Sequence, residues 1–129
     1  AMAFQKGLGC VHSLSHSLGG VDPRLHHGTL NAVFLPAVVK FNASAESVRK
    51  ENRLGRMAYA MGLKSADDIP GAIKTMNARL GLPKGLAAMG VKESQFDDVI
   101  RGALADHCHK TNPRLATPED YREMLLQSL

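Results

Sequence analysis

The chain has 129 residues and a net charge of +4, with 44% hydrophobic and 22% charged residues, a balance that is ordinary for a globular protein. Its length suits one domain that buries roughly two-thirds of its unfolded surface. Two cysteines make no disulfide framework, so we expect a reducing, cytoplasmic location. The longest apolar run, residues 32–39, is too short to cross a bilayer, and the chain opens without a signal-peptide pattern.

The first helix is expected over residues 1–18. Ala, Leu, Val and Met dominate the apolar content, which favours helices, and no segment alternates at period two for long enough to be a strand. No Ser, Thr, Asp or Asn precedes this helix as an N-cap, so we infer that the chain was cut from a longer protein. Gly19 and Gly20 are predicted to end the helix, because glycine adopts the left-handed exit conformation at low cost.

The second and third helices are expected over residues 28–41 and 44–61. Apolar residues in the second follow the i, i+3, i+4, i+7 pattern and widen into a broad face, so this helix should be central and bent at Pro36. Gly62 should end the third helix. Its inward-facing residues are predicted to be Leu54, Met57, Ala58 and Met61.

Three more helices complete the predicted fold. Ser65 should cap the fourth, which ends at Gly81 and turns an inner stripe of Ile69, Ile73, Met76 and Leu80 toward the core. A loop over 82–91 leads to a fifth helix over 93–109, and Thr117 caps the last one. The sequence therefore predicts an all-α fold, an antiparallel bundle of about six helices that spans residues 1–129.

Histidines gather near the start of the chain. His12 and His16 are four residues apart and share one face of a helix. The turn over residues 21–25 then brings His26 and His27 to the beginning of the next helix, so we expect four of the six histidines to converge on one point. We interpret them as half of a metal site whose other half lies outside this chain. Imidazole suits Fe, Zn, Cu or Ni about equally well, and satisfied core or interface histidines are the alternative interpretation.

Two other functions are also compatible with the sequence. Arg49, Arg53 and Arg56 fall on one helical face, which is compatible with a helical module that binds nucleic acid or protein, although a solvated face interleaved with glutamates explains the pattern as well. A self-contained zinc-binding domain would use the histidines at 12, 16, 26 and 27 as its ligands.

Several motifs together resemble one known family. Residues 9–20 (GCVHSLSHSLGG) and 25–36 (LHHGTLNAVFLP) look like the signature of iron-containing, group III alcohol dehydrogenases. The similarity continues through residues 70–73, 81–83, 108–114 and 116–120 and so covers nearly the whole chain. In that family this portion is the C-terminal helical domain, of the dehydroquinate-synthase-like type, and the dinucleotide-binding domain that precedes it is absent here.

The resemblance implies specific roles for four residues. His12 and His27 match two of four metal ligands, with Fe²⁺ or Zn²⁺ as the ion, and the other two ligands lie upstream. His16 matches a histidine that lines the substrate and nicotinamide pocket and could relay a proton, and Cys108 matches a position near that pocket, with a small buried thiol as the alternative. Most family members have proline at the position of His26, which is a departure. His27 precedes the glycine and keeps the register into Asn31 and Pro36, so we favour His27 as the ligand.

The resemblance also implies an activity. The parent protein would transfer hydride between NAD or NADP and a small alcohol or aldehyde, as a homodimer with neither nucleic acid nor membrane among its partners. The fragment alone is expected to be inactive, because a glycine-rich strand-turn-helix unit for the dinucleotide is missing from its sequence.

Overall fold

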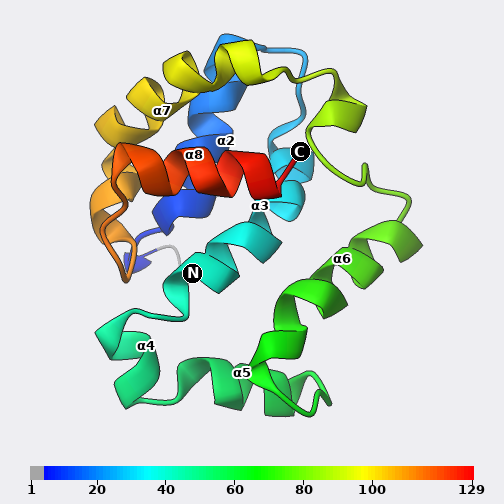
Figure 1. The fold of residues 1–129 in the computed structure, drawn as a ribbon, viewed down its shortest axis with the longest axis vertical. Coiled ribbons are helices and arrows are strands. Elements are labelled where there is room, and N and C mark those ends of the chain that lie inside the picture. The colour runs from blue at the N-terminus through cyan, green and yellow to red at the C-terminus, as the bar shows by residue number, and fades with distance from the viewer. Residues whose placement is uncertain (1–4) are drawn as a thin grey trace.

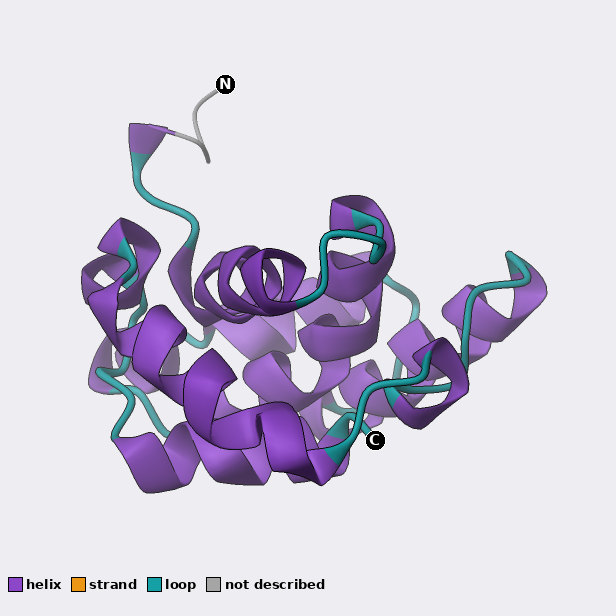
Figure 2. Cartoon of the chain, turned by 90° about the horizontal axis from the view of Figure 1, so that it is seen from above, coloured by secondary structure: helices purple, strands orange, loops and turns teal. Residues whose placement is uncertain are grey.

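The computed structural model describes residues 5–129, which form seven α-helices connected by turns and short 3₁₀ segments. Figure 2 shows helices and loops only, so the predicted all-α class is confirmed for this part of the chain. None of its helices is long and apolar enough to span a membrane. The α-helices are α2 (Gly9–Val21), α3 (His27–Asn42), α4 (Glu46–Lys50), α5 (Arg53–Ala60), α6 (Ile69–Arg79), α7 (Phe96–Ala105) and α8 (Pro118–Gln127), and the 3₁₀ segments are η1 (Ala66–Asp68), η2 (Ala87–Met89), η3 (Glu93–Gln95) and η4 (His107–Thr111).

Helix α3 belongs to both hydrophobic clusters of the molecule. Its N-terminal and middle turns pack with α2, α7 and α8 around Phe34 in the larger cluster. Val39, near its C-terminal end, joins Ala58, Ile69 and Ile73 in a smaller cluster that connects α3 to α5 and α6. Figure 1 accordingly shows α4, α5 and α6 grouped at one end of the molecule and α2, α7 and α8 at the other. The prediction that this helix is central is confirmed.

Helices α2 and α7 are in close contact at Gly102. The Ser17 hydroxyl donates a 2.7 Å hydrogen bond to the carbonyl oxygen of Val99, one turn before Gly102 in α7. A Cβ at Gly102 would lie only 2.2 Å from Ser17 Oγ and 3.1 Å from Ser17 Cβ. The absence of a side chain at Gly102 therefore lets α2, which carries two of the candidate site histidines, pack directly on α7.

The prediction for the boundaries of the first helix is wrong at its C-terminal end. Helix α2 continues through Gly19 and Gly20 to Val21, and neither glycine has a positive φ. The helix ends instead at Asp22, whose backbone is extended and whose N–H donates to the carbonyl oxygen of Leu18. Because Leu18 is fully buried, tertiary packing stabilises this last turn and outweighs the entropic cost of the glycines. The start expected at residue 1 falls partly outside the described residues, among which α2 begins at Gly9.

The third predicted helix is two short helices, because Asn52 adopts a left-handed conformation with φ of 46° between α4 and α5. Ala58 is buried as expected, but Met57 and Met61 are exposed. Helix α6 buries only Ile69 and Ile73 of its predicted stripe, while Met76 and Leu80 are exposed. A period-3.6 pattern overestimates burial here because the neighbouring elements cover only part of the apolar face of each short helix.

The fifth predicted helix is interrupted as well. Helix α7 ends at Ala105, Asp106 is extended with ψ of 141°, and the chain continues as the 3₁₀ segment η4. Predicted ends based on local signals are confirmed elsewhere: Ser65 and Thr117 form capping boxes, and Gly62 and Gly81 have positive φ.

The close approach of α2 and α7 generates a test with a matched control. Gly102→Ala should lower the free energy of unfolding by about 1–3 kcal/mol, because the new methyl displaces Ser17 from its bond to Val99. Gly19→Ala should raise it by roughly 0.5–1 kcal/mol, because a Cβ there meets no atom within 4 Å in a helical position. Urea unfolding monitored by circular dichroism measures both values. Equal effects of the two substitutions would contradict the described packing.

Candidate metal centre

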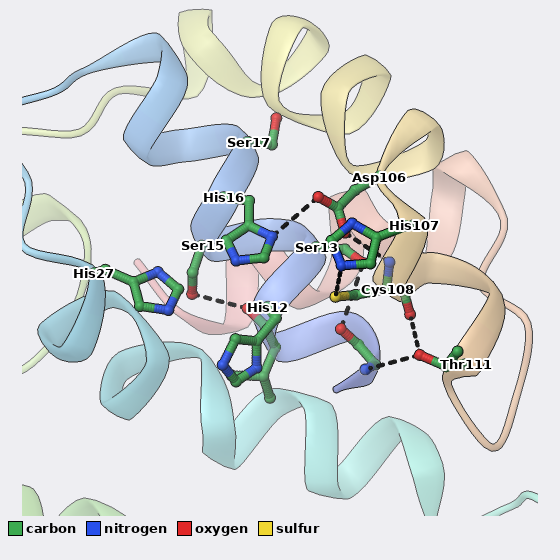
Figure 3. Close-up of polar contacts among 12 residues, drawn as sticks. His12, Ser13, Ser15, His16, Ser17, His27, Asp106, His107, Cys108 and Thr111 are labelled. Atoms are coloured by element: carbon green, nitrogen blue, oxygen red, sulfur yellow. Dashed lines mark hydrogen bonds and ion pairs between the residues drawn. The ribbon is translucent and has the colours of Figure 1, made fainter. Parts of the chain in front are cut away.

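Three of the four predicted histidines converge where α2 packs on the start of α3. The ring centroids of His12 and His27 are 5.3 Å apart, and His16 lies 5.7 Å from His12 and 5.2 Å from His27. His12 and His16 stand one turn apart on α2, and His27 is the first residue of α3. Figure 3 shows the three rings grouped on one side of α2.

His12 and His27 have the separation and orientation that a shared metal ion requires. Two imidazoles bound to one tetrahedral ion at ~2.1 Å have ring centroids about 5 Å apart. The amide nitrogen of Asn31 lies 3.0 Å from His27 Nε2 and 3.4 Å from His12 Nε2, so both ring nitrogens face one point. The amide NH₂ can donate to both nitrogens when each ring is in the neutral tautomer that leaves Nε2 unprotonated, which is the form that binds metal.

Two buried polar atoms at the same place have no hydrogen-bond partner among residues 5–129. They are His12 Nδ1 and Asn31 Oδ1. Buried polar atoms in folded proteins are nearly always paired, and an unpaired one points to a water or ion that the protein chain does not supply. The unpaired oxygen of Asn31 and the facing imidazoles fit a cation bound at His12 and His27, whereas His12 Nδ1 carries the ring proton in this tautomer and needs an acceptor.

His16 is oriented by a carboxylate that the sequence analysis did not single out. Its Nδ1 lies 3.0 Å from Asp106 Oδ2, and the other oxygen of Asp106 accepts a 2.8 Å hydrogen bond from the backbone N–H of Cys108. Burial alone would raise the pKa of Asp106, but the hydrogen bonds from Cys108 and His16 outweigh it and lower that pKa. A charged Asp106 keeps a proton on His16 Nδ1 and leaves Nε2 with a free lone pair.

Cys108 lies beside this pair, with its Sγ within 4.8 Å of the ligand atoms of His16 and Asp106. Its Sγ is 3.3 Å from His107 Nε2, and the His107 ring stacks 6.0 Å from that of His16. Burial, followed by the neighbouring Asp106, raises the pKa of the Cys108 thiol. The sequence offers only a local signal for Asp106, because an aspartate that accepts a hydrogen bond from the backbone N–H two residues later is a common turn; its pairing with His16 depends on tertiary packing.

His26 does not join the cluster. Its Nδ1 accepts a 3.4 Å hydrogen bond from the backbone N–H of Thr29, which makes it the N-cap of α3. The expected convergence of four histidines is therefore wrong for this one, and a self-contained zinc site that uses it is not supported. Between the two neighbours, His27 is the residue whose ring faces His12.

The arginine face considered for nucleic acid is not continuous. Arg49 lies in α4, whereas Arg53 and Arg56 lie in α5, beyond the left-handed residue Asn52. Arg53 also forms an ion pair with Glu51 at 3.0 Å. The binding-module alternative therefore loses the structural feature on which it depended.

The electrostatics of His12 are open to direct measurement. Burial first, then the positive charges that His27 and His16 acquire on protonation, lower the pKa of His12 below its ordinary value of 6.5. In the metal-free chain, His27→Ala should raise the pKa of His12 part of the way back, because burial remains, whereas His26→Ala should leave it unchanged. Histidine Cε1–H signals followed by NMR between pH 4 and pH 9 measure this.

The sign of the effect on stability follows from the same shift. A histidine whose folded-state pKa is below its unfolded value favours the fold above pH ~6.5 and disfavours it progressively as the pH falls below that value. A His12 signal that titrates at or above pH 6.5 would contradict the described burial.

Comparison with known proteins identifies the family of this chain. The model of the Fe-containing alcohol dehydrogenase family, C-terminal, matches residues 1–129. The 4-hydroxybutyrate dehydrogenase of Cupriavidus necator is 61% identical over 133 residues, which cover 100% of this chain and 35% of that protein. The NAD-dependent methanol dehydrogenase of Bacillus methanolicus is 36% identical, over 99% of this chain and 35% of that protein.

A solved structure shares the fold as well. The alcohol dehydrogenase from Oenococcus oeni superposes with a TM-score of 0.84 at 28% identity, over 95% of this chain and 33% of that one. The chain thus spans about a third of the length of the relatives that it matches. On the family match over its whole length and on the 61% identity, this chain belongs to the Fe-containing alcohol dehydrogenase family and corresponds to its C-terminal helical region.

Proposed function

We propose that the parent of this chain is a metal-dependent alcohol dehydrogenase that transfers hydride between NAD(P) and a small alcohol or aldehyde. The observation that carries the proposal is the convergence of His12 and His27 on one point in a chain of an iron-containing dehydrogenase family. The relatives quoted above are named dehydrogenases, and they are about three times as long as this chain. The remaining length would hold the dinucleotide-binding domain and the other metal ligands.

His12 and His27 would hold a divalent ion, Fe²⁺ in the first instance and Zn²⁺ as the alternative. When bound, such an ion supplies Lewis-acid stabilisation of the negative charge on the substrate oxygen. The chain contributes two neutral imidazoles, which leave the charge of the ion intact for this purpose. Their approach is fixed by the packing of α2 on α3, so the two ligands come from rigid helices rather than from loops.

His16 would move the substrate proton. It stands beside His12 and His27, and its side chain is about one-third exposed. Asp106 acts as the positioning residue, because its bond to Nδ1 leaves Nε2 free to accept the proton of an alcohol or of an intervening water. Exposure of the ring then allows the proton to pass to solvent. Cys108 lies next to this pair and would border the nicotinamide.

The substrate and the nicotinamide cofactor are proposed from the relatives. The 61% identity to a 4-hydroxybutyrate dehydrogenase makes a short hydroxyacid the first candidate substrate, and the name of the methanol dehydrogenase makes NAD the first candidate cofactor. A cytoplasmic location is supported by two cysteines that are both free, and a homodimeric parent is carried over from the family resemblance.

Adjacent histidines provide a matched pair of variants for the ligand assignment. In the complete parent protein, His27→Ala should remove most of the bound metal and lower turnover of 4-hydroxybutyrate at least 100-fold. His26→Ala should keep metal and turnover and cost only about 0.5–2 kcal/mol of stability, because it removes a helix cap. Metal analysis by mass spectrometry, combined with NAD-linked kinetics, separates the two. Full metal content in His27→Ala would refute the assignment.

A second variant distinguishes proton transfer from metal binding. His16→Gln in the parent should retain one equivalent of metal while kcat falls about 10²–10⁴-fold, the range that positioned acid–base groups contribute. The loss should be smaller at high pH, where hydroxide replaces the missing base. If His16→Gln loses its metal, or if its kcat is unchanged, the proton-relay role is wrong.

A further inference from the structure

A second group of metal-binding side chains meets on the side of His16 that faces away from His27. His16, Asp106 and Cys108 each offer one ligand atom, and these atoms all lie within 4.8 Å of one another. Figure 3 shows Asp106 and Cys108 on one side of the His16 ring and His27 on the other. Neither His12 nor His27 belongs to this second group.

The backbone holds these ligands in place before any ion binds. Asp106 is extended after the last turn of α7, and the Cys108 N–H bonds to its Oδ1, so Oδ2 is directed at His16 Nδ1. The hydroxyl of Thr111 donates a 3.0 Å hydrogen bond to the carbonyl oxygen of Cys108 and holds the η4 turn that carries the thiol. Only 2% of Cys108 is exposed, so it is the most buried of the three residues, and its sulfur lies on the protein side of the group.

The donor set is one nitrogen, one oxygen and one sulfur atom. Ligands bound at ~2.0–2.3 Å to a tetrahedral ion lie about 3–4 Å from one another, and the 3.0 Å between His16 Nδ1 and Asp106 Oδ2 is already at that spacing. A thiolate in the set favours Zn²⁺ over Fe²⁺, Mg²⁺ or Ca²⁺. The fourth position is within reach of the exposed His107, whose Nε2 is 3.3 Å from Cys108 Sγ.

We propose that His16, Asp106 and Cys108 form a second cation site of the zinc class, with His107 as its fourth ligand. Binding would release one proton to the buffer, from the Cys108 thiol, while the proton on His16 Nδ1 would move to Nε2. No oxidation or reduction is involved. If His16 is the proton relay of the proposed function, an ion held on its Nδ1 would also inhibit the parent enzyme, because it would fix the ring that must exchange a proton.

The site can be tested on this 129-residue chain with Co²⁺ as a spectroscopic probe for Zn²⁺. A sulfur ligand gives a thiolate-to-cobalt charge-transfer band in the near ultraviolet, which imidazole and carboxylate ligands do not. The band should appear on titration of the chain, should persist in Cys10→Ser and should disappear in Cys108→Ser. Both cysteines are buried and free, so the two variants are matched.

Two further variants separate this site from the His12 and His27 centre. His27→Ala should keep the band with an unchanged midpoint, whereas Asp106→Asn should weaken cobalt binding about 10–100-fold. Added Zn²⁺ should abolish the band in the unmodified chain. Circular dichroism verifies the fold of each variant. If Cys108→Ser does not fold, the cobalt affinity of Asp106→Asn tests the proposed site in its place.

Three outcomes would overturn the proposal. The first is no charge-transfer band at saturating Co²⁺, and the second is a band that survives in Cys108→Ser or is unweakened in Asp106→Asn. The third is loss of the band in a folded His27→Ala variant, which would assign the sulfur to the first centre. None of these measurements depends on turnover, so failure of the proposed dehydrogenase activity would leave this result unaffected.

Discussion

The packing of α2 between α3 and α7 is the constraint on which the rest of the structure depends. One face of α2 buries Cys10, Leu14 and Leu18 completely, while His12 and His16 project from another part of its surface. Because all these residues share one helix, the core contacts fix the height and rotation of both imidazoles. The same helix contacts α3, which begins with His27, and η4, which begins after Asp106. The site is therefore placed by the hydrophobic core.

That placement brings several imidazoles together with little opposite charge. His12, His16 and His27 lie within 6 Å of one another by ring centroid, and Asp106 is the acidic residue paired with the group. Burial is the larger cause that lowers the pKa of His12, and the like charges that protonation would place on His27 and His16 lower it further. Neutral rings that face one another present lone pairs without counter-charge. A divalent cation would stabilise this arrangement, whereas additional protons would oppose it.

How much of this could be read from the sequence depended on whether the signal was local. The spacing of His12 and His16, the capping boxes at Ser65 and Thr117 and the glycine ends at Gly62 and Gly81 are properties of a few neighbouring residues, and the structure reproduces them. The helix end predicted at Gly19 and Gly20 was wrong, because the packing of the buried Leu18 stabilises the helical turn that contains them.

Longer-range features could not be predicted in the same way. Asp106 lies 90 residues from His16, and its role depends on a helix end created by the packing of α7. Likewise, Asn52 separates α4 from α5 because its backbone is left-handed, and the helix-forming residues around it gave no sign of this break in the sequence. The choice between His26 and His27 was open for a related reason, since only the rotation of α3 on α2 decides which ring faces His12 and which one caps the helix.

His16 links the two halves of the site through the two nitrogens of one ring. Nδ1 bonds to Asp106, which is held in turn by the Cys108 N–H, so that nitrogen belongs to the α7 side of the molecule. The rest of the ring lies among His12 and His27, on the α3 side. Any change in the occupant of one side must alter the electron density and the protonation of the other, because both nitrogens share one aromatic system. A cation on the Asp106 side would make Nε2 a weaker base, while the carboxylate alone makes it a stronger one. The basicity of His16 Nε2 would thus depend on whether Asp106 stands alone beside Nδ1 or shares a cation with it.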